Sequence, residues 1–137
     1  MATKVAKIYK EIGDTFTGRE EFVKLTYDFS QDTGAFADDW QLGQASRQVL
    51  ITRAFVHVET ACTSAGSATV AIGTTSDVDA FLDATSGAVA SLTEDAVIYE
   101  TTAQHIMAAD DYFVLDVGTA DLTAGKLHVY VWFVRAD

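Results

Sequence analysis

The sequence predicts an all-β fold, an antiparallel, jelly-roll-like β-sandwich preceded by a short N-terminal arm. Short runs with alternating apolar side chains recur along the chain, and turn-forming residues separate them. No long helical pattern lies among these runs, which favours packed sheets over a helix-covered sheet. The 137 residues suffice for one domain, which should bury roughly 70% of the surface of its unfolded chain.

The N-terminal segment differs from the rest of the chain. Four apolar side chains have the i, i+3, i+4, i+7 spacing of an amphipathic helix: Val5, Ile8, Tyr9 and Ile12. Gly13 follows, as a glycine that ends a helix would. A single helix of about ten residues is marginally stable alone in water, so it needs a surface to pack on. We therefore expect residues 1–21 to be an arm, helical or extended, that packs either on its own domain or on a partner.

Residues 22–137 carry the strand signals of the predicted sandwich. Strands are expected at 22–29, 48–60, 68–74, 96–102, 112–117 and 127–134. The turn-like residues at 63–67 predict that the second and third of these strands form a hairpin. We expect a long loop at 30–46, and a helical turn at 76–82 with Ser76 or Asp77 as its N-cap.

The last strand, 127–134, is apolar on both faces. Four side chains point one way: Leu127, Val129, Val131 and Phe133. Tyr130, Trp132 and Val134 point the other way with His128. A strand covered on one face only would alternate with polar residues, so a second sheet, a neighbouring subunit or a partner should cover each face. We predict that Tyr130 and Trp132 bind a partner.

Charge and cysteine content exclude several classes of function. Residues 1–24 carry five basic and four acidic side chains, and residues 25–137 carry four basic and sixteen acidic ones. An acidic body repels phosphate backbones, so we expect no nucleic-acid binding. The single cysteine, Cys62, allows no internal disulfide, which fits folding in a reducing cytoplasm. The chain shows no signal-peptide pattern and no membrane span.

The sequence offers little for catalysis. The three histidines are His57, His105 and His128, and no catalytic or phosphate-binding motif surrounds them. His57 and His128 stand beside aromatic residues on strands, which is typical of structural histidines. We expect no enzymatic activity and no cofactor. The loop with Asp77, Asp79 and Asp83 has oxygen ligands suited to calcium but lacks the EF-hand spacing, and N-capping explains the same residues.

Four segments resemble small structural proteins of tailed bacteriophages, above all head decoration (cement) proteins. The segments are ITRAFVHVETA at 51–61, SATVAIG at 67–73, SDVDAFL at 76–82 and LTAGKLHVYV at 122–131. The resemblance implies a β-sandwich that assembles as an oligomer, often a homotrimer, on the capsid exterior and clamps capsid subunits together. It carries over no functional residues, because such proteins bind through surfaces.

The resulting expectation is a phage virion structural protein, made in the host cytoplasm, that stabilises the assembled head lattice. Its expected partners are the major capsid protein and further copies of itself. The arm would anchor it through Lys4, Val5, Lys7, Ile8 and Ile12, so deleting residues 1–20 should remove capsid binding and leave melting unchanged.

Two alternatives stay open. One is a tail or fibre component. The other is a carbohydrate-binding module whose exposed rings stack on sugars. The candidate rings are Trp40, Tyr99, Tyr112, Tyr130 and Trp132.

Overall fold

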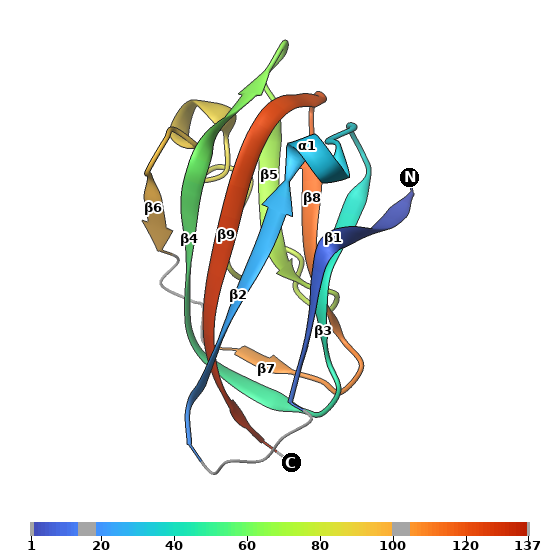
Figure 1. Cartoon of the computed structure of the whole chain (residues 1–137), viewed down its shortest axis with the longest axis vertical. Helices are drawn as coiled ribbons and strands as arrows, with labels where there is room; N and C mark the ends of the chain where they lie inside the picture. Colours follow the sequence, from blue (N-terminus) through green and yellow to red (C-terminus); the bar gives the residue numbers. More distant parts are fainter. Residues whose placement is uncertain (1, 14–18, 100–104, 137) are drawn as a thin grey trace.

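The computed structural model describes residues 2–13, 19–99 and 105–136, which form two packed β-sheets (Figure 1). One sheet has the order β1-β3-β8-β5, and the other has the order β2-β9-β4-β6, with β7 also paired to β4. The elements are β1 Thr3–Ile12, β2 Glu21–Asp28, α1 Phe29–Asp32, β3 Asp39–Ala45, β4 Val49–Ser64, β5 Thr69–Thr74, the 3-10 turn η1 Val89–Ser91, β6 Val97–Tyr99, β7 His105–Met107, β8 Tyr112–Gly118 and β9 Leu122–Arg135. The prediction of an antiparallel β-sandwich is confirmed.

The predicted hairpin between 48–60 and 68–74 is wrong. β4 lies in the five-stranded sheet and β5 in the four-stranded sheet, so these consecutive strands are not paired. β4 pairs instead with β9 along most of its length, while β5 pairs with β8. Val56 on β4 and Ile72 on β5 are both fully buried in the core between the sheets. The residues between β4 and β5 therefore carry the chain across the core from one sheet to the other.

The N-terminal segment is a strand, so its helical interpretation is wrong and its extended interpretation is the one observed. β1 pairs in parallel with β3, with Lys4 opposite Trp40 and Ile12 opposite Ala45. Ala6 and Ile12 are buried in the common core, whereas Val5 and Ile8 are exposed. The burial pattern is therefore not that of a helix face. Hydrogen bonding to β3 supplies the partner that a short isolated segment lacks, and it outweighs the helical spacing.

Residues 30–46 hold more structure than the predicted loop. They include most of α1 and all of β3, where Trp40, Leu42 and Ala45 are buried. Gly43 is required here, because a Cβ at this position would lie 2.3 Å from the Lys10 carbonyl oxygen of the adjacent β1. The chain thus crosses close to its own N-terminal strand at a position where only glycine fits.

The predicted helical turn at 76–82 is also wrong. These residues form bends and turns that fold back on β5, and Phe81 and Leu82 enter the core. Backbone hydrogen bonds from Phe81 and Leu82 to the Ile72 carbonyl, 2.9 and 3.0 Å long, replace those of a helix. Packing of the two side chains against the sheet decides the local conformation.

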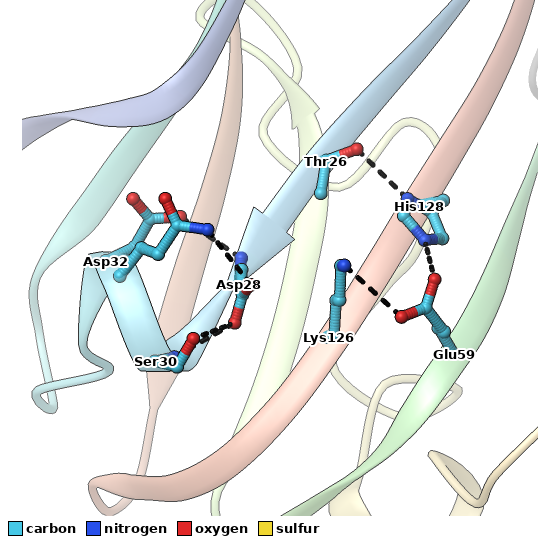
Figure 2. Close-up of polar contacts among 8 residues, drawn as sticks. Thr26, Asp28, Ser30, Asp32, Glu59, Lys126 and His128 are labelled. Carbon is cyan, nitrogen blue, oxygen red and sulfur yellow. Dashed lines mark hydrogen bonds and ion pairs between the residues drawn. The ribbon is translucent and has the colours of Figure 1, made fainter.

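The carboxylate of Asp32, at the end of α1, joins strands from both sheets. It accepts the backbone N–H of Lys7 in β1 at 2.9 Å and that of Asp28 in β2 at 3.1 Å. The Asp32 carbonyl accepts the indole N–H of Trp40 in β3 at 2.9 Å. Asp28 in turn caps α1 through the Ser30 backbone N–H, as Figure 2 shows. The hydrogen bonds of Asp32 thus hold β1 against the rest of the sandwich.

Candidate docking surface

The outer face of the five-stranded sheet carries aromatic side chains in register across its strands. Tyr130 of β9 lies opposite Lys24 of β2 on one side and Phe55 of β4 on the other. Phe55 is in turn opposite Tyr99 of β6. One residue pair further along, Phe22 of β2 lies opposite Trp132 of β9. We call Phe22, Phe55, Tyr99, Tyr130 and Trp132 the aromatic face.

The inward side chains of β9 are buried in the core as predicted, namely Leu127, Val129, Val131 and Phe133. No layer of the described chain covers the opposite face, where Tyr130 and Trp132 are half-buried among their neighbours. Phe22 is 51% exposed and Tyr99 is 69% exposed. Because contiguous exposed apolar surface is uncommon on isolated domains, this face has the character of an interaction site.

The rings of the aromatic face pack against one another, and Phe22, Tyr130 and Phe55 stack. Phe55 and Tyr130 have ring centroids 4.8 Å apart and planes within 16°, and Phe22 lies 5.8 Å beyond Tyr130 at 24°. Near-parallel rings so close must overlap face to face, since rings side by side in one plane would be further apart. The guanidinium of Arg53 lies 4.2 Å from the centroid of the Trp132 ring and covers it. The stack is thus a preformed surface in which neighbouring side chains lie against the rings of Phe55, Tyr130 and Trp132.

His128 lies at the border of the aromatic face with both ring nitrogens occupied (Figure 2). Its Nδ1 is 3.0 Å from Thr26 Oγ1, and its Nε2 is 2.8 Å from Glu59 Oε1. Lys126 Nζ lies 3.2 Å from the other oxygen of Glu59. Hydrogen bonds from His128 and then Lys126 lower the pKa of the Glu59 carboxyl. A buried imidazole with two partners matches the predicted structural histidine.

A groove runs beside His128 between β1 and the outer face of β2. It encloses about 440 Å³. Apolar and charged side chains line it together, including Ile8, Lys10, Phe22, Lys24, Glu59 and Lys126. We call it the basic groove, because it holds three of the nine Lys and Arg side chains of a chain whose net charge is −11.

The seven residues predicted to bind a partner do not form one surface. Tyr130 and Trp132 lie on the aromatic face, and Ile8 lines the basic groove. Ile12 is buried in its own core, so it is not accessible to a partner. Lys4 pairs with Asp38 at 2.9 Å.

The other two predicted residues, Val5 and Lys7, are exposed on β1. Phe22 and Phe55 of the aromatic face were not predicted as binding residues, and Tyr99 was named only as a candidate sugar-binding ring. Each lies on a predicted strand, and only the register across strands brings them beside Tyr130.

The described residues give no support for a metal site or a membrane span. Among them, no group of three His, Cys, Asp or Glu side chains is placed to hold a metal ion. Asp79 and Asp77 lie close together, and a hydrogen bond that protonated Asp79 donates to Asp77 raises the pKa of Asp79. Within the same residues, no helix is long and apolar enough to cross a membrane. Cys62 is buried, and this burial raises its thiol pKa to about 11.

Comparison with known proteins finds similarity only in fold. No protein-family model and no curated protein matches the sequence. A chain of the cyanophage Pam1 capsid asymmetric unit is similar with a TM-score of 0.66 and 16% identity, over 91% of this chain and 91% of that chain. A chain of the capsid of Ralstonia phage GP4 is similar with a TM-score of 0.60 and 15% identity, over 92% and 90% of the two chains. The same sandwich therefore occurs in two phage capsids.

Proposed function

We propose that this chain is a phage capsid protein that decorates the assembled head and stabilises it. The observation that carries the proposal is the shared fold with chains of two phage capsids, over about nine-tenths of each chain. The resemblance of residues 51–61 and 122–131 to head decoration proteins points the same way. On this proposal the chain is made in the host cytoplasm, adds to the outside of the head and has no enzymatic activity.

The physical logic of decoration is mass action. A protein that binds the assembled lattice and not its free subunits stabilises the lattice by its binding free energy. The centre of the aromatic face, made by Phe55, Tyr130 and Trp132, is the proposed contact with the major capsid protein. Its rings are already held by cross-strand stacking, so binding orders few additional side chains. Rigid, partly buried aromatic rings are typical of the residues that contribute most to binding.

The proposal includes a jelly-roll topology and a homo-oligomer. From β2 to β5 each successive strand changes sheet, β6 and β7 then lie together in the five-stranded sheet, and β8 and β9 change sheet again. This alternation is what a jelly roll of two interlocked Greek keys requires. A homotrimer is the oligomer that the resemblance implies, and the proposed contact between copies is argued below.

The two alternatives have less support. For a carbohydrate-binding module, ring faces would have to be open to stack on sugars, but Phe55, Tyr130 and Trp132 have neighbouring rings or Arg53 against them. Trp40 is 1% exposed and lies in the core. A tail or fibre component would use the same fold elsewhere on the virion, so the position of the chain on the virion decides between them.

Co-sedimentation with heads that lack this chain tests the proposal. We expect saturable binding of the wild-type chain to assembled heads and none to free capsid subunits. Tyr130→Ser should weaken head binding about tenfold or more, as loss of a central interface aromatic does. Tyr112→Ser is the matched control, because Tyr112 is also half-buried but lies on β8 in the other sheet. No binding of the wild-type chain, or equal loss in both variants, would overturn the proposal.

A further inference from the structure

The two ends of the five-stranded sheet differ in charge and in shape. At one end lies the basic groove, a concave surface where Lys10, Lys24 and Lys126 surround the apolar Ile8 and Phe22. Glu59 is the one carboxylate among its lining residues, and it is already paired with Lys126 at 3.2 Å. Lys10 and Lys24 are both exposed. This end therefore suits an occupant that carries apolar side chains beside carboxylates.

The opposite end of the sheet carries exposed apolar side chains beside carboxylates. β6 is the last strand of the sheet order, and its outward side chains Val97 and Tyr99 are 50% and 69% exposed. The turn before it carries Glu94 and Asp95, and the Asp95 side chain is 84% exposed beside His57. We call these four residues, Glu94, Asp95, Val97 and Tyr99, the β6 edge. Its four residues are exposed, and it is acidic where the groove is basic.

We propose that the β6 edge of one copy docks in the basic groove of the next copy. Val97 and Tyr99 would meet Ile8 and Phe22, while Glu94 and Asp95 would face the exposed lysines. The inference rests on the homo-oligomer in the function proposed above and names the two surfaces that form it. It leaves the centre of the aromatic face uncovered for the head lattice.

The contact joins two different surfaces, so successive copies can repeat it head to tail. A heterologous contact of this kind closes into a ring when the rotation between copies permits. A ring of three copies would be the homotrimer. Opposite charges at the two ends of one sheet also oppose the alternative pairing of like ends, because groove against groove would bring lysines together.

Charge reversal in the full-length chain, followed by sedimentation velocity, tests the inference. Lys24→Glu and Glu94→Lys, made separately, should each weaken self-association about tenfold or more at low salt. Combined in one chain, they should restore association to within about threefold of the wild type, since the swapped charges face each other again. Tyr99→Ser should weaken association and lower the melting temperature only slightly, because the side chain is 69% exposed and loses only its ring contact with Phe55.

Matched controls reverse exposed charges that lie outside both surfaces. Arg47→Glu and Asp79→Lys should leave self-association unchanged. A monomeric wild type, equal weakening by the controls, or no recovery in the double variant would overturn the inference. Head binding is measured separately, so an intact co-sedimentation result with a monomeric chain would overturn this inference alone.

Discussion

The ring of Phe55 in β4 stacks on the ring of Tyr130 in β9, with centroids 4.8 Å apart and planes 16° apart. This pair lies on the side of the five-stranded sheet that no second layer of the described chain covers. Cross-strand aromatic pairs add stability beyond the area they bury, about 0.5–1.5 kcal/mol each. The pair thus stabilises the fold and at the same time holds the proposed docking surface in shape.

The two tryptophans should differ in what they contribute to stability. Trp40 is 1% exposed and donates a hydrogen bond to Asp32, so Trp40→Ala should cost about 3–5 kcal/mol of unfolding free energy. Trp132 is half-buried and packs beside Phe22, Phe55 and Arg53, so Trp132→Ala should cost about 1–2 kcal/mol. Urea unfolding of the isolated chain measures both. Equal losses would mean that Trp132 is covered by another layer or subunit in solution.

Removing the N-terminal strand should destabilise the domain. Deleting residues 1–12 removes the β1–β3 pairing, the buried Ala6 and Ile12 side chains, and the Lys7 N–H bound by Asp32. Loss of the buried isoleucine alone costs about 2–5 kcal/mol, so we expect at least that much. Thermal melting and urea unfolding of the truncated chain check it. Unchanged melting would instead support the sequence-based expectation of an arm separate from residues 22–137.

A pair of carboxylates on the four-stranded sheet should make stability fall with rising pH. Asp116 lies opposite Asp39, and burial followed by the charge of Asp39 raises the pKa of Asp116. A raised carboxyl pKa in the folded state makes the folded chain hold its proton more tightly. The resulting stability is full below the unfolded value near 3.8 and is lost as the pH rises through the folded pKa.

Asp116→Asn should therefore stabilise the chain at neutral pH, by up to about 1 kcal/mol, as relief of a directly opposed like-charge pair does. Its advantage over the wild type should grow between about pH 3 and neutral pH. The measurement is the free energy of unfolding of both proteins across this range. An advantage that does not depend on pH would show that the carboxylate charge is not the cause.

Glu59 should have the opposite pH dependence. Its pKa is lowered by hydrogen bonds with His128 and then Lys126, so its contribution is present above the unfolded value of 4.5 and is lost as the pH falls through the folded pKa. Glu59→Gln should thus be less stable than the wild type near neutral pH, and the difference should shrink on acidification. Paired melting curves across this range measure it, and a difference that stays constant would exclude the ion pair as its source.

Side-chain patterning predicted the sandwich and most of its strands, because alternation of apolar residues reports directly on burial between two sheets. The inward set of β9, from Leu127 to Phe133, is one example. The pattern failed at β1, where Val5 and Ile8 happen to have helical spacing while the strand is stabilised by its distant partner β3. The spacing of apolar residues within one segment does not show which distant segment it will pair with.

The docking surface was predictable only in part for the same reason. Tyr130 and Trp132 were identified because their strand is apolar on both faces. Phe55 lies beside them because β4 pairs with β9, and Tyr99 lies beside Phe55 because β6 pairs with β4; the whole fold sets this register. The basic groove likewise combines β1 and β2 with Lys126 of β9, and local sequence cannot bring those together.

On the proposed function a phage encodes this chain, and immunogold electron microscopy of its intact virions tests that central claim most directly. A polyclonal antibody raised against the full-length protein is applied to whole particles. The proposed decoration role predicts dense, regular gold labelling over the surface of the heads and none on the tails. Gold confined to tails or fibres, or virions that carry no label although they infect normally, would contradict the assignment to the capsid exterior.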